Sequence, residues 1–509
     1  MSGRKRFAFN VVMNWFAMAV GMVIPFFLTP MVVRHLGPTG YGVWILAVST
    51  VAYLNLLDFG LRSAIIRFVS KAEAQHKPEN SRSAIRAALW FRLLVSAGVA
   101  LLSLLLATSF PHFFKVPPDL QRAAQITVLV CSLGVAATLV SGVYGAVLAA
   151  THRFDVLSAI GIVQVIARAG GVILILRSGH GLTTLAYWDF AVVLGAGVAT
   201  CGAALKLFPS CRVRVGRPEM ATLKMIWSYS FTMFIILIAG QIIFSTDNMV
   251  VGAFLSVGLV AFYSIGGSLT VYSRQVVAAL STTFTPMASG LEASGKIDEL
   301  RKLLMRGTQA SLALALPISL TLLFRGKTFI GLWMGQRYSQ VSGTVLQILM
   351  ISQFFTIADI TAGNIMFAIG KQKAVAKCAV VEATLNLTLS LILVKTIGIY
   401  GVAWGTSIAM ALIHLFFWPA YVRKVLDIPM RTYVWEGWTK ITLCSIPFAI
   451  ACAMADRYWH PLSMVTFFAE VLMTLPVYAF GVLLVFQEDA RSGLRRWRES
   501  RLAQVQQAH

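Results

Sequence analysis

Charged residues are scarce in this sequence, and acidic residues are the scarcest. Only 12% of the 509 residues are charged, with 20 Asp and Glu against 43 Lys and Arg, whereas 58% are hydrophobic. An average soluble protein has about 25% charged residues. A water-soluble core cannot bury so much apolar surface, and apolar runs of about 20 residues, long enough to cross a bilayer, recur along the chain. The composition therefore excludes a soluble globular protein and predicts a polytopic membrane protein.

Metal and redox motifs are also missing. The sequence has six cysteines, but no C-x-x-C motif and no Cys/His spacing typical of a metal site. We therefore predict no metal site, no disulfide framework and no cofactor. The net charge of +23 would suggest nucleic acid in a soluble protein, but the basic residues fall mostly in short loops between apolar spans. Membrane topology explains this pattern better, so no nucleic-acid partner is predicted.

The apolar runs predict about fourteen transmembrane helices. The first run follows Arg4, Lys5 and Arg6 and is too long for a cleaved signal peptide, so we expect a retained helix that starts in the cytosol. The predicted helices cover residues 8–33, 43–67, 84–110, 122–150, 155–177, 181–206, 223–248, 256–283, 308–325, 343–369, 375–396, 401–422, 439–456 and 462–487.

The distribution of basic residues supports this topology. With a cytosolic N-terminus, Lys and Arg occur in the predicted cytosolic segments about three times as often as in the outer segments, as the positive-inside rule requires. An error in one early helix would scramble this asymmetry. The sequence therefore predicts a multi-pass protein with both termini in the cytosol.

An internal repeat indicates duplication of a helical bundle. The segment MVVRHLGPTGYGVW from Met31 is similar to MVVGAFLSVGLVAF from Met249, and two looser matches occur at nearly the same spacing. Six helices per copy give both copies the same orientation in the membrane, as in some alternating-access transporters. The predicted domains are an N-terminal six-helix bundle at 1–220, a C-terminal six-helix bundle at 221–430, helices 13 and 14 at 431–487, and a basic cytosolic tail at 488–509.

A family resemblance rests on motifs near the N-terminus. Asn14, Pro25 and Pro30 form the pattern N-x10-P-x4-P, which is followed by LGPTGYG from Leu36 and YLNLLDFGL from Tyr53. The pattern resembles the bacterial polysaccharide and O-antigen flippases of the multidrug/oligosaccharidyl-lipid/polysaccharide exporter superfamily, and the helix count and repeat extend the resemblance over the whole chain. It implies a transporter, not an enzyme, that moves an undecaprenyl-pyrophosphate-linked oligosaccharide from the cytosolic to the outer leaflet of the inner membrane.

The resemblance also implies partners. They are the lipid-linked oligosaccharide and membrane lipids, with a polysaccharide polymerase and chain-length machinery as candidate protein partners. Two other functions stay open: a cation-coupled multidrug exporter of the same fold, and a membrane enzyme of polysaccharide assembly. The exporter would favour an acid-lined cavity and fewer helices. The enzyme would be expected to have a large loop or catalytic domain, and the sequence has no D-x-D motif or clustered His and carboxylates.

Five arginines lie inside the predicted spans: Arg62, Arg67, Arg92, Arg168 and Arg274. An arginine at the bilayer centre costs about 2.5–3.5 kcal/mol, which favours a protein-lined or water-filled location. Arg67 and Arg92 lie nearer the cytosolic helix ends, where a long side chain can reach the headgroups. We predict that Arg168 and Arg274 line a cavity shared by both bundles and, with Arg62, bind substrate, because a guanidinium binds phosphate oxygens bidentately.

Several acids also lie inside the predicted spans. Asp58 and Arg62 are four residues apart and would share one helix face, which predicts an ion pair that is either permanent or opened by substrate. Asp247 and Asp359 are candidates for binding a coupling cation, with helix capping or packing as the alternative. The full set is Asp58, Asp189, Asp247, Asp359, Glu382 and Glu470.

Prolines and tryptophans have distinct expected roles. Pro25 and Pro30 each remove a backbone hydrogen bond from the first helix and allow a kink, which is either a lateral gate or a static bend. Tryptophans near the predicted span ends, such as Trp44 and Trp188, are expected to lie in the aromatic belts at the membrane interfaces.

Overall fold

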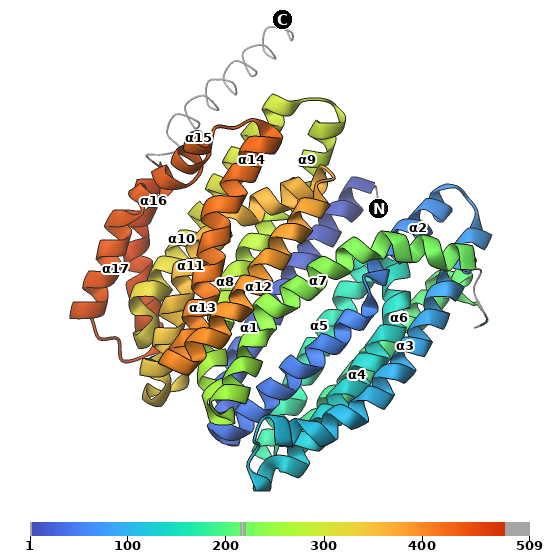
Figure 1. Ribbon diagram of the computed structural model, residues 1–509, viewed down its shortest axis with the longest axis horizontal. Coiled ribbons are helices and arrows are strands. Elements are labelled where there is room, and N and C mark those ends of the chain that lie inside the picture. The colour runs from blue at the N-terminus through green and yellow to red at the C-terminus, as the bar shows by residue number, and fades with distance from the viewer. Residues whose placement is uncertain (1–2, 214–215, 217–219, 484–509) are drawn as a thin grey trace, which may run out of the picture. The chain divides into compact units, whose positions relative to one another are not determined.

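The computed structural model describes residues 3–213, 216 and 220–483, without the side chains of residues 3–12, 14 and 220–231. The predicted tail at 488–509 and the side chain of Asn14 lie outside this part. The described chain is helical and contains no strand (Figure 1). The predicted all-α class is therefore confirmed.

Contacts between residues divide the chain into two compact units. The first unit consists of residues 1–265 and 376–405, and the second of residues 266–375 and 406–509. Three helices continue from one unit into the other: α8 (Val257–Ser281), α12 (Gln372–Ile397) and α13 (Ile399–Leu412).

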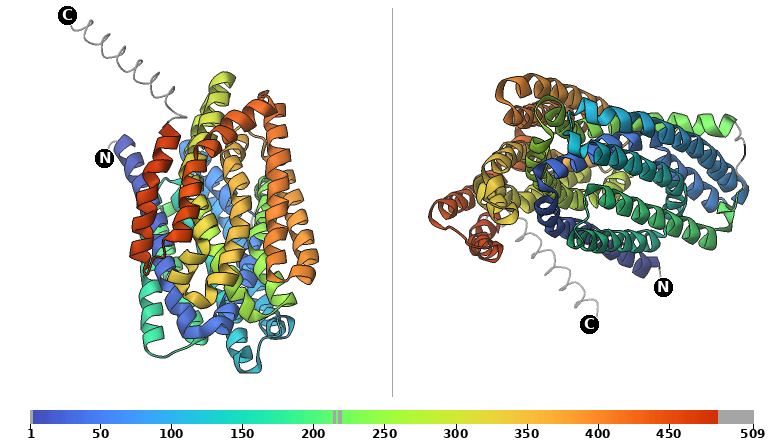
Figure 2. Two further views of the ribbon diagram at one scale, coloured as in Figure 1. Left: turned by 90° about the vertical axis from the view of Figure 1, so that its left-hand side faces the viewer. Right: turned by 90° about the horizontal axis from the view of Figure 1, so that it is seen from below.

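In the first unit, long helices are joined by short turns. Consecutive helices such as α3 and α4, or α5 and α6, pack side by side, and α1 packs on α5 (Figures 1 and 2). Apart from the parts of α8, α12 and α13, the helices of this unit are α1 (Gly3–Ala52), η1 (Tyr53–Asp58), α2 (Leu61–Ala74), α3 (Pro78–Phe113), α4 (Pro118–Ala150), α5 (Phe154–Arg177), α6 (Leu182–Leu207), η2 (Pro209–Cys211) and α7 (Met220–Phe254).

In the second unit, the long helices α10 and α11 pack against each other, and α17 packs on α10. Apart from the parts of α8, α12 and α13, the helices of this unit are α9 (Phe284–Ala293), α10 (Ile297–Met334), α11 (Gln336–Ala368), η3 (Ile413–Phe417), α14 (Trp418–Leu426), α15 (Met430–Val434), η4 (Trp435–Thr439), α16 (Lys440–Cys444), α17 (Ile446–Tyr458) and a last helix at Met464–Leu483.

The unit boundary does not coincide with the predicted bundle boundary at residue 220. We predicted that α7 begins the second bundle, but α7 contacts α1, α2 and α3 of the first unit. The predicted duplication concerns ancestry and helix order rather than contacts, so it stays a prediction.

Two breaks near the N-terminus correct the predicted helix limits. The expected outer loop at 34–42 is helical except for a kink at Gly37, whose φ of 68° and ψ of 172° are accessible almost only to glycine. The expected continuous helix at 43–67 is interrupted after η1, where Phe59 and Gly60 both have left-handed backbone angles. Glycine adopts this conformation without steric penalty, which explains why the chain turns there.

The ninth predicted helix is longer than expected. It was predicted at 308–325, but α10 runs from Ile297 to Met334. Its first turn carries Asp298 and Glu299, which stabilise a helix N-terminus but mask the helix in a search for apolar runs. The predicted loop at 326–342 is correspondingly reduced to a turn around Gly335.

Among the described residues, twelve helical segments are long and apolar enough to cross a membrane. The first, Trp15–Ala74, contains the kink at Gly37 and covers two of the predicted helices. The 25-residue helix α8 is not among the twelve, although it coincides with the eighth predicted helix. The multi-pass architecture is therefore established, and the predicted number of fourteen spans stays a prediction.

Candidate functional site

A pocket in the first unit lies between α1, α5 and α6. Its volume is about 260 Å³, and most of its lining is apolar or aromatic. Two charged side chains enter it, Arg168 from α5 and Asp189 from α6. Charges inside an apolar helix group are expensive and are retained mainly where they bind ligands or each other. This pocket is the candidate substrate site.

Arg168 and Asp189 form an ion pair across the pocket. Arg168 Nε lies 2.6 Å from Asp189 Oδ1, and 45% of the Arg168 side chain is exposed, against 23% for Asp189. Arg168 therefore lines a pocket within the first unit, whereas the predicted cavity shared by both bundles and the substrate-binding role of Arg168 stay predictions. The pairing partner is on a different helix, so residue spacing alone does not reveal it.

Trp188 forms one wall of the pocket and approaches α5 closely. Its indole Nε1 donates a hydrogen bond to the carbonyl oxygen of Ala167 over 3.2 Å. The ring packs against Gly171, where an added Cβ would overlap the indole. Trp44 also lines the pocket. The two tryptophans predicted for the interfacial belts therefore help to enclose Arg168 and Asp189.

The proline-containing part of α1 supplies the third wall. Gly21, Pro25 and Thr29 line the pocket, and Thr29 Oγ1 donates to the Pro25 carbonyl oxygen at 2.7 Å. Pro25 has no N–H, so it cannot donate to the carbonyl of Gly21, its normal helical acceptor. The proline thus leaves a backbone acceptor on the helix wall next to the ion pair.

Asp58 does not pair with Arg62 as predicted; it pairs with Arg92. Arg92 Nη2 donates to Asp58 Oδ1, and Arg92 Nη1 donates to the Leu139 carbonyl oxygen at 2.6 Å. Arg92 is only 3% exposed, so the expectation that it reaches the headgroups is also wrong. Asp58 ends η1 before the break at Gly60, and this break removes the shared helix face on which the Arg62 prediction depended.

The other two predicted cationic residues are in different environments. Arg62 in α2 is exposed, and no ion pair of it is found within the described part of the chain. Arg274 in α8 is half-buried and belongs to the second unit. The cavity that we predict these residues share with Arg168 involves both units, so it stays a prediction.

Asp247 lies in a polar cluster inside the first unit. It is 7% exposed, and its Oδ2 accepts a hydrogen bond from the Tyr263 hydroxyl at 2.6 Å. On the neighbouring residue, Asn248 Nδ2 donates to Ser49 Oγ at 3.1 Å, which joins α7 to α1. These contacts fit the packing alternative as well as they fit a cation site.

Asp359 of α11 lies at the centre of a buried cluster in the second unit. His414 Nδ1 lies 3.1 Å from Asp359 Oδ2, and the Tyr433 hydroxyl donates to Oδ1 at 2.9 Å. All three residues are buried. His414 lies in the π-helical segment η3, and Tyr433 precedes the π-helical segment η4; such turns are frequent at functional sites. The sequence does not predict either partner, apart from the signal of a histidine inside an apolar run.

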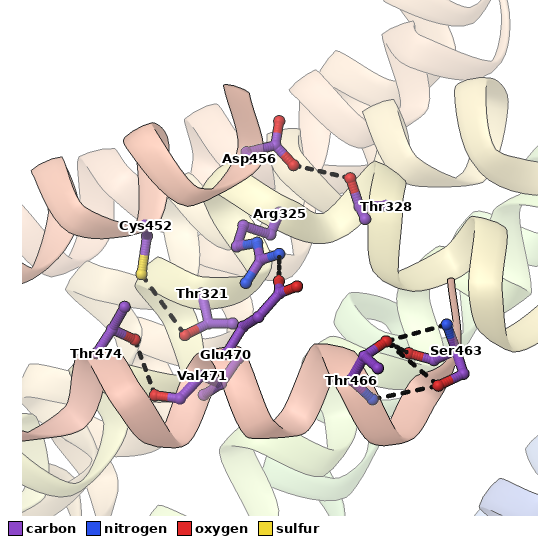
Figure 3. Close-up of polar contacts among 10 residues, drawn as sticks. All are labelled: Thr321, Arg325, Thr328, Cys452, Asp456, Ser463, Thr466, Glu470, Val471 and Thr474. Carbon is purple, nitrogen blue, oxygen red and sulfur yellow. Dashed lines mark hydrogen bonds and ion pairs between the residues drawn. The ribbon is translucent and has the colours of Figure 1, made fainter. Parts of the chain in front are cut away.

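A second polar cluster joins α10 to the C-terminal helices (Figure 3). Arg325 Nη2 lies 2.5 Å from Glu470 Oε2. The guanidinium also lies 4.6 Å from the ring centroid of Phe467. Thr328 donates to Asp456 of α17 at 2.7 Å. Arg325 is 1% exposed, and α10 continues past it, although the predicted helix at 308–325 ends at this residue.

Metal-ligating side chains do not gather in the described part of the chain. Within residues 3–213, 216 and 220–483, no group of three His, Cys, Asp or Glu side chains is arranged to hold a metal ion. The six cysteines are all unpaired with one another. The pocket's own lining residues offer charge, hydrogen bonding and aromatic contact to a ligand.

Comparison with known sequences gives a family match over most of the chain. The model of the family described as polysaccharide biosynthesis protein matches residues 31–343. A relative from Shigella flexneri, "Putative O-antigen transporter", is 22% identical over 81% of this chain and 97% of its own length. The "Uncharacterized membrane protein EpsK" of Bacillus subtilis is 23% identical over 97% of this chain and 99% of its own.

Further similarity extends to an archaeal protein and to solved transporter structures. The "Probable low-salt glycan biosynthesis flippase Agl15" of Haloferax volcanii is 22% identical over 80% of this chain and 82% of its own. The structure of the lipid II flippase MurJ in an inward closed conformation has a TM-score of 0.76 at 15% identity, over 94% of this chain and 99% of that chain. An inward-facing MATE family transporter of the MOP superfamily has a TM-score of 0.70 at 15% identity, over 82% and 99%. These structures show the fold.

Proposed function

Because this chain belongs to the polysaccharide biosynthesis protein family, we propose that it is a flippase for a lipid-linked oligosaccharide. The cargo is an undecaprenyl-pyrophosphate-linked repeat unit, which moves across the bacterial inner membrane by alternating access. The names of two relatives, an O-antigen transporter of Shigella and a glycan biosynthesis flippase of Haloferax, support transport of a glycan. A polymerase and its chain-length machinery, which consume the sugar at the outer face, are the proposed protein partners.

The observation that carries this proposal is the Arg168–Asp189 pair in its pocket. A guanidinium stays protonated at physiological pH and binds two phosphate oxygens at once. In the empty protein the Asp189 carboxylate compensates the Arg168 charge, which lowers the cost of an arginine at this depth. The pyrophosphate takes over that role when it binds, and Asp189 is released.

The rest of the pocket suits the sugar side of the cargo. Trp44, Trp188 and Tyr41 present aromatic surfaces with polar tips, a combination that contacts both the apolar and the hydroxylated parts of a ligand. The Gly21 carbonyl, which lacks its helical donor because of Pro25, can accept a hydrogen bond from a sugar hydroxyl. This arrangement suits a phosphate-linked polar headgroup.

Resetting of the empty carrier would use a cation that binds at Asp359 or Asp247. Ionisable groups inside spans commonly form proton relays, and Asp359 with His414 and Tyr433 has the composition of such a relay. Asp247 with Tyr263 is the alternative position. Coupling to a proton or sodium gradient is thus part of the proposal.

The test is flipping of labelled lipid-linked oligosaccharide in liposomes that contain the purified protein. Arg168→Ala should reduce the rate about tenfold or more, since a hydrogen-bonded charge contributes about 1.5–3 kcal/mol. Arg168→Lys should restore only part of the rate, because lysine keeps the charge and loses the planar fork.

Two further variants separate binding from folding. Arg168→Ala leaves Asp189 without its partner, so the double variant Arg168→Ala with Asp189→Asn should recover any lost protein abundance but not transport. Arg177→Ala, an exposed arginine in the last turn of α5, is the matched control and should flip at the wild-type rate. Normal flipping by the double variant would disprove the role of Arg168.

A further inference from the structure

An apolar groove runs along the same helix pair that carries the ion pair. It has a volume of about 400 Å³ and is lined by residues 159–167 of α5 and residues 192–199 of α6. Gln164 is the only polar residue among its lining residues. The hollow arises because small side chains face each other there, such as Ala159, Ala196 and Ala199, with Gly195.

The groove and the Arg168–Asp189 pocket are neighbours along both α5 and α6. On α5 the two linings overlap along the helix: the pocket lining begins at Val165, and Arg168 lies one helical turn beyond Gln164 of the groove. On α6, which runs in the opposite direction beside α5, the groove ends at Val192 and the pocket includes Asp189, one helical turn away. The groove and the pocket therefore follow each other along the α5–α6 pair, which we call the seam. The groove is its apolar part, and the pocket is its charged part.

We infer that this groove holds the prenyl chain of the lipid-linked substrate while its phosphate is bound at Arg168. This inference rests on the proposed function and adds a binding position for the apolar part of the cargo. A prenyl pyrophosphate has the same two-part character as the seam, with an apolar chain joined directly to an anionic group. Annular lipid alone does not require a cationic site at the end of its groove.

The dimensions of the groove match this occupant. At about 1.5 Å per residue, the nine residues from Ala159 to Ala167 extend over about 12 Å. One leaflet of the hydrocarbon core is about 15 Å deep. A chain that starts at Arg168 and follows the groove thus stays beside the protein through most of one leaflet.

The groove can be filled without disturbing the helix. A Cβ added at Gly195 would meet no atom within 4 Å, and Gly195 lies inside α6, where leucine is a better helix former than glycine. Gly195→Leu therefore occupies the groove while the fold is kept. Gly98→Leu is the matched control, since Gly98 is exposed in α3, has the same open space and lines neither hollow.

The experiment compares two donors with the same pyrophosphate-linked sugar, one with an undecaprenyl chain and one with a geranyl chain. In liposomes, Gly195→Leu should slow flipping of the undecaprenyl donor about tenfold, the effect of displacing about two chain methylenes. Flipping of the geranyl donor should stay near the wild-type rate, because a short chain does not need the groove. Gly98→Leu should change neither rate.

Other outcomes separate this inference from the proposed function. If wild-type protein flips neither donor, the proposed function is wrong and the inference falls with it. If wild-type protein flips both donors and Gly195→Leu slows both equally or neither, only the groove assignment is wrong. A photoreactive residue in place of Val163, which lines the groove, should crosslink to the undecaprenyl donor; crosslinking to bulk phospholipid alone would identify the groove as an annular lipid site.

Discussion

Three arginines inside the helices each form an ion pair with a carboxylate on another helix. Arg92 pairs with Asp58, Arg168 with Asp189, and Arg325 with Glu470. Pairing lowers the cost of a charge in an apolar environment, which explains why few of these side chains need the headgroups. The three pairs differ in exposure: the Arg168 side chain is 45% exposed, Arg92 4% and Arg325 1%. Exposure is what distinguishes the ligand-binding candidate from the structural pairs.

The buried Asp58–Arg92 pair should contribute to stability. Removal of one partner from a buried pair leaves an uncompensated charge and costs about 3–5 kcal/mol. Because the Asp58 side chain is 21% exposed, we expect Asp58→Asn or Arg92→Gln to lower the free energy of unfolding by about 3 kcal/mol, near the bottom of that range. The measurement is thermal unfolding of purified protein in detergent.

The double variant and a control complete this test. Asp58→Asn combined with Arg92→Gln should lose less stability than the two single changes added together, because neither charge is then left alone. Arg62→Gln should have little effect, since Arg62 is exposed. Additive losses would show that Asp58 and Arg92 act independently.

At the scale of elements, the α5–α6 pair positions both the pocket and the groove. Adjacent glycines in α5 have opposite surroundings: Gly171 packs against the Trp188 ring, and Gly170 faces open space. Gly171→Ala should displace Trp188, which lines the pocket, and lower stability by about 1–3 kcal/mol, the usual effect of overpacking. Flipping should slow as well, because the wall of the pocket moves.

Gly170→Ala is the control for this change. It adds the same methyl group one residue away without a clash, and replacing a helical glycine should raise stability by up to about 1 kcal/mol. Both variants can be compared by thermal unfolding and by the liposome assay. Equal behaviour of the two variants would contradict the role of the Trp188 contact.

At the scale of the whole molecule, transport should respond to the membrane potential. A lipid pyrophosphate carries about two negative charges, and each charge gains about 2.3 kcal/mol per 100 mV in a favourable field. Outward movement from a cell that is negative inside is therefore favoured by about 4.6 kcal/mol per 100 mV when the protein does not neutralise the cargo. The liposome assay measures this by comparing flipping with and without an imposed potential.

The same assay distinguishes the coupling ion. An imposed proton or sodium gradient should accelerate flipping by wild-type protein. Asp359→Asn should remove that acceleration but should leave flipping down the concentration gradient of the substrate unchanged. Asp247→Asn is the corresponding variant of the other candidate. Flipping that ignores all three gradients would mean a facilitated process driven only by consumption of the sugar at the outer face.

The amino-acid sequence by itself determines the class of this protein and most of its helices. Whether a chain is soluble depends on its total composition, and a transmembrane helix depends on one continuous apolar run. Both can therefore be predicted without knowledge of tertiary contacts. The depth of Arg168 in its helix can likewise be counted from the chain. The apolar pattern does not determine the helix ends, because Gly37, Gly60 and the charged first turn of α10 act locally against it.

Only the tertiary structure decided which side chains meet. Asp58 was assigned to Arg62 on helical spacing, but a left-handed turn at Phe59 and Gly60 brings it to Arg92 instead. Helix packing likewise brings Asp189 to Arg168. It also brings His414 and Tyr433 to Asp359. Spacing along one helix fixes which face a residue occupies, whereas the partner on the next helix is fixed by packing between helices, which a single sequence does not encode in any local pattern.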